Sequence, residues 1–308
     1  MTTFSGVIPP IVTPLLSHEQ IDPEAVDRIV NHLINGNVSG IFALGTTGEG
    51  PSLSYQIRYE MVERVCEAAD GRRPVLAGIT DTCYSESLAL AEHAENSGAA
   101  AVVAASPFYF QPKQAELRDW FQRLADESPL PLILYNMPSC VGVTLELDLV
   151  AGLAEHPNIV GIKDSSGDLR YFQRLCSELR QPRRFCVFMG PEERLADAVA
   201  MGADGGVCGG ANLLPNIYSS LYRVAVEGRT EEIPAMHQII DTLFSEVYRD
   251  PHRNMQLIPG LKHAMKLAGL CSEVTAPPLT AISEQHAEQI ESAFPALQAA
   301  TNRLTVIC

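Results

Sequence analysis

Short runs of apolar residues recur along the first two thirds of the chain, and each run is apolar throughout rather than at alternate positions. A continuous apolar run bounded by turn residues is typical of a strand that is buried on both faces of a parallel sheet. We therefore expect strands at residues 6–13, 40–44, 74–79, 100–105, 130–135, 159–162, 185–189 and 205–208.

Amphipathic segments with helix-start residues separate these runs. Asp22-Pro23-Glu24 combines an N-cap residue, a proline at the first helical position and an acid in the first turn. Ser85-Glu86-Ser87 and residues 164–168 provide similar starts. Strand followed by helix, eight times over, predicts an α/β fold, a (β/α)8 TIM barrel. A doubly wound sheet is the alternative, but the GxGxxG turn expected after its first strand is missing.

The strand pattern stops after Pro215, and the rest of the chain has the periodicity of helices. Helices are expected at residues 217–227, 231–248, 259–270 and 283–297. We interpret residues 1–224 as the barrel that carries the active site. Residues 225–308 are interpreted as a C-terminal helical extension packed on the barrel, not as an independent domain.

Composition and charge narrow the classes of partner. The 308 residues hold 22 Lys and Arg against 37 Asp and Glu, a net charge of −15, and 46% are hydrophobic. This is a globular composition, and its acidity argues against binding nucleic acid. No apolar run approaches the ~20 residues that span a bilayer, and Met1-Thr2-Thr3-Phe4-Ser5 lacks a basic signal segment. These features indicate a cytoplasmic protein without a membrane partner.

The cysteines and histidines predict no metal site. Eight cysteines and eight histidines are scattered, with no CxxC pair, no HExxH and no cysteine near a histidine at ligand spacing. Most cysteines are therefore expected to be buried, reduced thiols. No metal ion or other cofactor is expected.

Lys163 is the most informative candidate for chemistry. Barrel enzymes place their catalytic groups at the carboxyl ends of the strands, and Lys163, one of only four lysines, directly follows the run 159–162. An ammonium group there is costly to bury unless its pKa falls or a counter-ion lies near. A lysine with a lowered pKa is a nucleophile that forms Schiff bases with carbonyl groups. The alternative is a buried lysine that is paired with Asp164 or another carboxylate for structure alone.

Three other strand-end segments carry reactive or unusual side chains. Tyr135 ends the fifth expected strand, where its phenol could relay protons or simply fill the core. The segment Gly45-Thr46-Thr47-Gly48-Glu49-Gly50 predicts either a backbone nest for a carboxylate or an ordinary turn, and it is not a phosphate-binding P-loop. Tyr109 lies in the aromatic segment 106–112, which is too apolar to be left in water and is expected to pack, for example against another subunit.

Taken together, three motifs resemble one superfamily. They are Gly45-Thr46-Thr47-Gly48-Glu49, Tyr135-Asn136-Met137-Pro138 and Gly161-Ile162-Lys163-Asp164. In order and spacing they are similar to the dihydrodipicolinate synthase / N-acetylneuraminate lyase superfamily, and the resemblance extends from residues 7–14 to the helical tail.

The resemblance implies a metal-free class I lyase or aldolase that handles pyruvate and an aldehyde on a (β/α)8 barrel, usually as a tetramer built from two dimers. It implies that Lys163 forms the Schiff base and that Tyr135 transfers protons. Thr46 and Thr47 would hold the carboxylate and link Tyr135 to Tyr109. Tyr109 would reach into the neighbouring subunit's site. Val207 would line the pyruvate pocket.

Two features limit the choice of substrate. Dihydrodipicolinate synthases carry an arginine two residues after the proline of the Tyr-Asn-x-Pro motif, where it holds the carboxylate of aspartate semialdehyde; here that position is Cys140. A thiol cannot replace a charged five-donor group, unless another arginine such as Arg170 or Arg194 reaches the site. Residues 190–193, Gly190-Pro191-Glu192-Glu193, are similar to the stretch with which sialic acid lyases bind sugar hydroxyls, so Gly190, Glu192 and Glu193 are candidate substrate contacts. Two solvated acids that open a helix are the alternative.

Four functions remain to be compared. The first is a 2-oxo acid aldolase or dehydratase, for example one acting on a 2-keto-3-deoxy sugar acid. The second is dihydrodipicolinate synthase itself. The third, an inactive barrel used for binding or regulation, is disfavoured because each residue of the imine chemistry is present. The fourth, a metal-dependent aldolase, is disfavoured by the missing His/Asp/Glu cluster.

Overall fold

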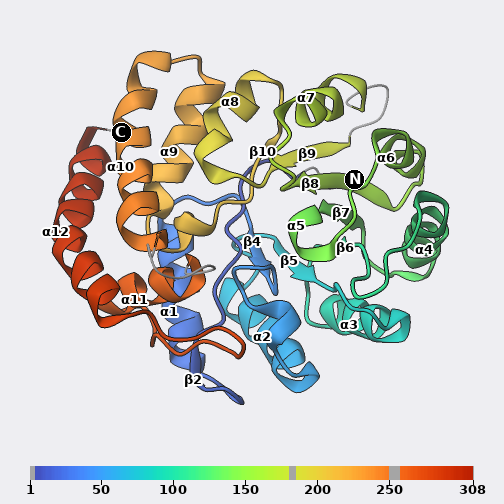
Figure 1. Ribbon diagram of the computed structural model, residues 1–308, viewed down its shortest axis with the longest axis horizontal. Helices are drawn as coiled ribbons and strands as arrows, with labels where there is room; N and C mark the ends of the chain where they lie inside the picture. Colours follow the sequence, from blue (N-terminus) through green and yellow to red (C-terminus); the bar gives the residue numbers. More distant parts are fainter. Residues whose placement is uncertain (1–3, 180–184, 250–256, 308) are drawn as a thin grey trace.

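Eight parallel strands form one curled sheet in the computed structural model, which describes residues 4–179, 185–249 and 257–307 (Figure 1). The strands are β1 (Gly6–Val7), β4 (Ile41–Ala43), β5 (Val75–Gly78), β6 (Ala101–Ala105), β7 (Leu132–Asn136), β8 (Ile159–Asp164), β9 (Cys186–Met189) and β10 (Gly205–Gly206). Each lies within or beside a run expected to be a strand. The short antiparallel hairpin of β2 (Leu15–Ser17) and β3 (Gln20–Ile21) was not expected.

The sheet closes into a barrel. Its strand order is β1-β10-β9-β8-β7-β6-β5-β4, and Pro10 bridges to Phe42 between the two outer strands. The Phe42 N–H donates to the Pro9 carbonyl and the Ile11 N–H donates to the Phe42 carbonyl, both at 2.9 Å. The predicted barrel is therefore confirmed.

Helices follow the strands, and all of them except the short α5 form the outer layer (Figure 1). They are α1 (Pro23–Asn35), α2 (Tyr55–Ala69), α3 (Tyr84–Asn96), α4 (Gln114–Glu127), α5 (Pro138–Val141), α6 (Leu147–Ala154), α7 (Leu169–Glu178), α8 (Leu195–Ala200) and α9 (Pro215–Val226). The expected caps are present. The Asp22 side chain accepts from the Ala25 N–H, and Asp168 accepts from the N–H groups of Arg170 and Tyr171.

The C-terminal part consists of helices that lie beside α9 (Figure 1). It comprises η4 (Thr230–Glu232), α10 (Ile233–Thr242), η5 (Leu243–Tyr248), α11 (Leu257–Leu267) and α12 (Glu284–Ile307). The single helix expected at 231–248 is divided into a 3-10 turn, an α-helix and a π-helical end. The expected boundary after residue 224 lies inside α9. None of the helices in the described part of the chain is long and apolar enough to cross a membrane.

Apolar side chains fill both faces of the sheet. One cluster lies between the strands and the helices, and a second fills the inside of the barrel with Phe42, Leu76, Val103, Ile133 and Phe188. Burial on both faces is the reason why the strands are continuously apolar. Five of the seven cysteines described are buried, as expected from the sequence.

Three short 3-10 turns complete the carboxyl-end face of the barrel. They are η1 (Gly50–Ser52) after β4, η2 (Glu192–Arg194) after β9 and η3 (Gly209–Asn212) after β10. The loops that contain them carry several of the candidate site residues. The short helix α5 has the same relation to β7, because it begins two residues after Asn136. These loops therefore present backbone and side-chain groups where active sites of such barrels lie.

Candidate active site

Lys163 lies inside the barrel among aromatic rings. In the parallel ladder it is paired with Tyr135 of β7 on one side and with Phe188 of β9 on the other. Its Nζ atom is 4.1 Å from the centroid of the Tyr135 ring and 5.5 Å from that of Phe42, and the residue is only 5% exposed. Ring faces attract a cation at such distances, so the aromatic cage partly compensates for the lost hydration of the ammonium group.

Asp164 does not supply the counter-ion that a purely structural lysine would need. Successive residues of a strand point to opposite faces of the sheet, so the two side chains diverge. The Asp164 carboxylate accepts from Asn136 Nδ2 at 2.7 Å and from the Ser166 hydroxyl at 3.0 Å. In the described part of the chain, no carboxylate lies within ion-pair distance of Lys163. The structural pairing considered from the sequence is therefore not formed.

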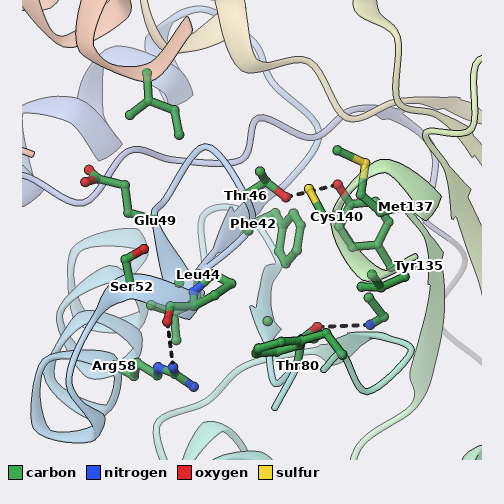
Figure 2. A pocket seen from close by; sticks show the side chains of 18 of the residues that line it. Phe42, Leu44, Thr46, Glu49, Ser52, Arg58, Thr80, Tyr135, Met137 and Cys140 are labelled. Carbon is green, nitrogen blue, oxygen red and sulfur yellow. Dashed lines mark hydrogen bonds between the residues drawn. The ribbon is translucent and has the colours of Figure 1, made fainter. Parts of the chain in front are cut away.

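Tyr135 connects the lysine to the loop after β4. Its hydroxyl oxygen lies 3.2 Å from Thr46 Oγ1, at hydrogen-bond distance (Figure 2). The ring is buried, whereas Thr46 is exposed on the loop. A phenol held by a hydroxyl beside an amine is an arrangement that can pass protons.

The loop after β4 has an unusual backbone. Leu44 and Glu49 both have left-handed dihedral angles, with φ of 61° and 60°, which residues with a Cβ rarely adopt. A Cβ on Gly50 would lie 2.3 Å from the Leu44 carbonyl oxygen, so only glycine fits there. Thr13 Oγ1 donates to the Gly48 carbonyl at 2.6 Å and fixes the loop from below. This shape is what brings Thr46 to Tyr135.

A cavity of about 450 Å³ opens beside Tyr135 and Thr46, which belong to its lining, whereas Lys163 lies next to Tyr135 and is not among the lining residues (Figure 2). Loops and strand ends from β4 to β7 line it on one side, and the C-terminal part of the chain lines it on the other. Its polar lining residues include Thr46, Glu49, Ser52, Arg58, Thr80, Tyr135, Ser139 and Cys140, and its apolar lining includes Phe42, Phe108, Met137, Ile258, Pro278 and Leu279. A cavity of this size fits a small organic substrate.

The charged groups of this cavity are already engaged. Arg58 is the one cationic side chain among the lining residues described, and it pairs with Asp81 at 2.8 Å. Its other nitrogens donate to the carbonyls of Leu53 at 3.1 Å and Pro51 at 3.3 Å. Glu49 is paired with Lys262. The lining residues described therefore offer no free cation to an anionic substrate group.

Cys140 lines this cavity and is exposed. The arginines considered as replacements for the missing charge do not reach it. Arg170 and Arg194 are exposed and neither lines the cavity, and Arg194 pairs with Asp197 at 3.3 Å.

Glu192 has other partners than the expected substrate. Glu192 is only 6% exposed. Its two carboxylate oxygens accept from the Gly210 N–H at 2.7 Å and from the Tyr248 hydroxyl at 2.8 Å. Burial raises the pKa of this carboxyl above its ordinary value. A carboxylate with both oxygens engaged this way is poorly placed to accept from substrate hydroxyls, and instead it ties η2 to η3 and to the C-terminal part of the chain.

Gly190 and Glu193, the other two candidate residues of that stretch, also lie outside the cavity lining. Glu193 is half-buried, and the Gly190 N–H donates to the Asp164 carbonyl at 2.8 Å. The placement of the stretch 190–193 thus argues against the expected sugar-hydroxyl contacts.

Tyr109 is not linked to Tyr135 within the chain. It is 89% exposed, has φ of 82°, and its ring packs edge-on against Phe110, with centroids 5.2 Å apart. Thr47 and Val207, by contrast, are buried: Val207 belongs to the inner cluster with Tyr135, and the Gly209 turn lies against the Thr47 hydroxyl. The structure therefore gathers most of the expected groups but leaves Tyr109 facing outward.

Two supporting interactions were not anticipated from the sequence. Asn136 donates to Asp164 and accepts from the Leu145 N–H at 3.0 Å, which fixes the residue next to Tyr135. Glu49 was part of a recognised motif and Lys262 one of four lysines, but nothing indicated that they meet. The sequence gives one signal for this lysine: Lys262 lies between the apolar residues Leu261 and Met265, which are both buried in the structure.

The fold and the site define a class of proteins: (β/α)8-barrel enzymes with a buried lysine at the carboxyl ends of the strands. The chain belongs to the Dihydrodipicolinate synthetase family, whose sequence model matches residues 3–297. Members of this family are class I pyruvate-dependent lyases and synthases, so the protein is an enzyme of this class.

Similar proteins differ in their named activities. The chain is 33% identical over 290 residues to the 4-hydroxy-tetrahydrodipicolinate synthase of Methanocaldococcus jannaschii, covering 94% of this chain and 97% of that protein. It is 31% identical over 293 residues to the probable 2-dehydro-3-deoxy-D-pentonate aldolase YjhH of Escherichia coli, with 94% and 96% covered. The solved structure of dihydrodipicolinate synthase from Bacteroides thetaiotaomicron is 40% identical and superposes with a TM-score of 0.92 over 97% of this chain and 100% of that chain.

Proposed function

We propose that the protein is a Schiff-base aldolase that reversibly cleaves a 2-keto-3-deoxy sugar acid into pyruvate and an aldehyde without a carboxylate. The observation that carries this choice is that the described residues lining the cavity offer no free cation. Cys140 stands where the superfamily's synthases hold an arginine, and Arg58 is engaged by Asp81. A second substrate that is an anion would lose charged hydrogen bonds there, whereas a hydroxylated, neutral aldehyde would not.

Lys163 is the proposed nucleophile. Its amine attacks the keto carbon of the substrate to give a carbinolamine. Tyr135 donates its proton to the carbinolamine hydroxyl, which leaves as water, and a protonated imine remains. The Tyr135 oxygen lies at hydrogen-bond distance from Thr46, which would hold the phenol in place while it loses and regains its proton.

The protonated imine then acts as the electron sink for cleavage. The Tyr135 phenolate takes the proton of the C4 hydroxyl, the C3–C4 bond breaks, and its electron pair moves toward the imine nitrogen. An aldehyde leaves and an enamine of pyruvate remains. Tyr135 returns its proton to C3, which restores the protonated imine and leaves a phenolate. Water then hydrolyses the protonated imine, which releases pyruvate and the free Lys163 amine, and the Tyr135 phenolate takes up the remaining proton.

The loop after β4 is proposed to hold the carboxylate of the 2-oxo acid. Thr46 and Thr47 offer hydroxyl donors, and the N–H groups of Thr46, Thr47 and Gly48 complete the set, since those of Glu49 and Gly50 donate to carbonyls within the turn. Such nests bind anions without needing a charged side chain. The carboxylate next to the keto carbon is thereby distinguished from the rest of the substrate.

Condensation of pyruvate with aspartate semialdehyde is the competing function, because several similar proteins are named as synthases. The two functions are separated by a panel assay. Candidate 2-keto-3-deoxy acids are tested for pyruvate release, and aspartate semialdehyde for pyruvate consumption. We expect release from at least one 2-keto-3-deoxy acid, with kcat/KM at least about 10²-fold above that for aspartate semialdehyde. The reverse preference would refute the aldolase proposal.

We also infer a homo-oligomer, a tetramer built from two dimers, in which Tyr109 lies near a neighbouring subunit's site. Tyr109 and Phe110 are 89% and 79% exposed, an aromatic pair that is costly to leave in water. Aromatic residues are enriched at subunit interfaces. The backbone at Tyr109 is left-handed, with φ of 82°, and the ring packs only edge-on against Phe110 at the surface among the ring contacts described.

A further inference from the structure

A buried ion pair joins the catalytic loop to the C-terminal part of the chain. Glu49 follows the two threonines of the loop after β4, and Lys262 lies on α11, more than two hundred residues later. Both side chains are completely buried. Glu49 also lines the substrate cavity (Figure 2), so the pair lies directly behind the groups proposed to bind the substrate.

The contacts of this pair hold both side chains to the same segment. Lys262 Nζ donates to the Val274 carbonyl at 2.7 Å, and the second oxygen of Glu49 accepts from the Ala276 N–H at 2.6 Å. Burial lowers the pKa of Lys262 and the Glu49 carboxylate opposes that shift. Because a buried ion pair adds little net stability over an apolar pair, stability alone is a weak reason for its presence.

The backbone of Glu49 gives a second reason. Its φ of 60° is unfavourable for a residue with a side chain, so the conformation needs other contacts to hold it. From this conformation the Glu49 N–H donates to the Thr46 carbonyl at 3.0 Å. Thr46 in turn lies 3.2 Å from the Tyr135 hydroxyl. An unbroken series of contacts therefore runs from Lys262 to the phenol.

We propose that Lys262 is a positioning residue for the lyase reaction: through Glu49 it keeps the loop after β4 in its left-handed turn and so holds the Thr46 hydroxyl against Tyr135. The C-terminal helices are then part of the catalytic apparatus rather than only a cover for the barrel. The inference rests on the proposed roles of Lys163 and Tyr135.

Exchange of the C3 protons of pyruvate tests this without any aldehyde. Formation of the imine and enamine on Lys163 lets the methyl protons exchange with D₂O, and Tyr135 transfers them, so NMR follows the steps in which Thr46 is proposed to act. We expect Lys262→Met to slow the exchange at saturating pyruvate at least about tenfold. The matched control is Lys266→Met on the same helix, because Lys266 pairs with Glu273 at 2.6 Å and its side chain is half exposed. The Lys266→Met protein should exchange the pyruvate protons at the wild-type rate.

A double-mutant cycle distinguishes positioning from general loss of structure. If Lys262 acts through the Thr46 hydroxyl, Lys262→Met should cost less than about twofold in a Thr46→Val background, because the hydroxyl is already gone. The same tenfold loss in both backgrounds, or no loss in a folded Lys262→Met protein, would overturn the inference. If Lys262→Met does not fold, the apolar pair Glu49→Leu/Lys262→Met, which leaves no buried charge unpaired, enters the same cycle and decides by the same criteria.

The outcomes also separate this inference from the proposed function. A wild-type protein that exchanges no pyruvate protons refutes the Schiff-base chemistry itself. A wild-type protein that exchanges them at a rate equal to that of Lys262→Met refutes only the role of Lys262.

Discussion

Tyr135 and Lys163 are directly paired across the parallel strands β7 and β8, and the lysine Nζ lies 4.1 Å from the centre of the tyrosine ring. Paired residues of neighbouring strands project to the same side of the sheet. The two side chains therefore meet inside the barrel as a consequence of strand register. This contact is the geometric basis of the proposed imine chemistry.

Removing the phenol should separate imine formation from turnover. Tyr135→Phe keeps the ring beside Lys163 but removes the proton carrier, so we expect kcat to fall by about 10² to 10⁴ while pyruvate can still be trapped, more slowly. Steady-state kinetics and trapping measure the two effects. Tyr222→Phe is the matched control, because that hydroxyl donates to the Asp204 carbonyl, outside the cavity lining. Wild-type turnover in Tyr135→Phe would show that the hydroxyl has no chemical role.

Restoring the missing cation should change the substrate preference. Cys140→Arg adds a guanidinium group, with its charge and several hydrogen-bond donors, to the cavity wall. We therefore expect kcat/KM for condensation with aspartate semialdehyde to rise on the order of tenfold or more. Cleavage of the accepted 2-keto-3-deoxy acid should fall. Ser139→Arg, at the neighbouring cavity residue, is the control for charge alone. Efficient condensation by the unmodified protein would contradict the argument.

Glu192 should make stability depend on pH. Burial raises the pKa of its carboxyl, so its contribution to the free energy of unfolding is complete below the unfolded-state value of about 4.5 and is lost as the pH rises through the native value. Relative to Glu192→Gln, the wild-type protein should therefore lose stability as the pH increases above about 4.5. Urea unfolding at several pH values measures the difference. Parallel curves for wild type and Glu192→Gln would be inconsistent with the burial argument.

The exposed aromatic pair should hold subunits together. Replacing Tyr109 and Phe110 by serine removes the apolar area that we assign to the interface, so sedimentation velocity should show smaller species than for the wild type. Val226→Ser, at another exposed apolar residue (58%), should not change the assembly. A wild-type protein that is monomeric and fully active at nanomolar concentration would rule out a shared site.

The barrel and its central pair were predictable because local patterns determine them. Continuous apolar runs mark strands buried on both faces, and Asp22 and Asp168 mark helix starts through their own side-chain bonds. The carboxyl ends of parallel strands lie at the same edge of the sheet, so Tyr135 and Lys163 could be expected near each other even though the strand register was not known. The hairpin of β2 and β3 was missed because strands of three and two residues carry no period.

The remaining parts of the site depend on contacts between distant segments. In sequence Glu192 was a candidate substrate contact, with a solvated acid as the alternative. The structure instead buries it against the Tyr248 hydroxyl, which lies on the π-helical end of a helix expected to be regular. The pairing of Glu49 with Lys262 likewise requires α11 to lie over the loop after β4. Apolar periodicity gives the face of a helix but not the element it packs against.

The central claim is that Lys163 forms a Schiff base with pyruvate, and trapping tests it most directly. The protein is treated with pyruvate and borohydride, digested, and the modified peptide is identified by mass spectrometry. The account predicts one pyruvate-derived adduct on Lys163 and none in Lys163→Ala, which should also have no turnover. An adduct on Lys113, Lys262 or Lys266 instead, or a wild-type protein that turns over without a trappable adduct, would contradict it.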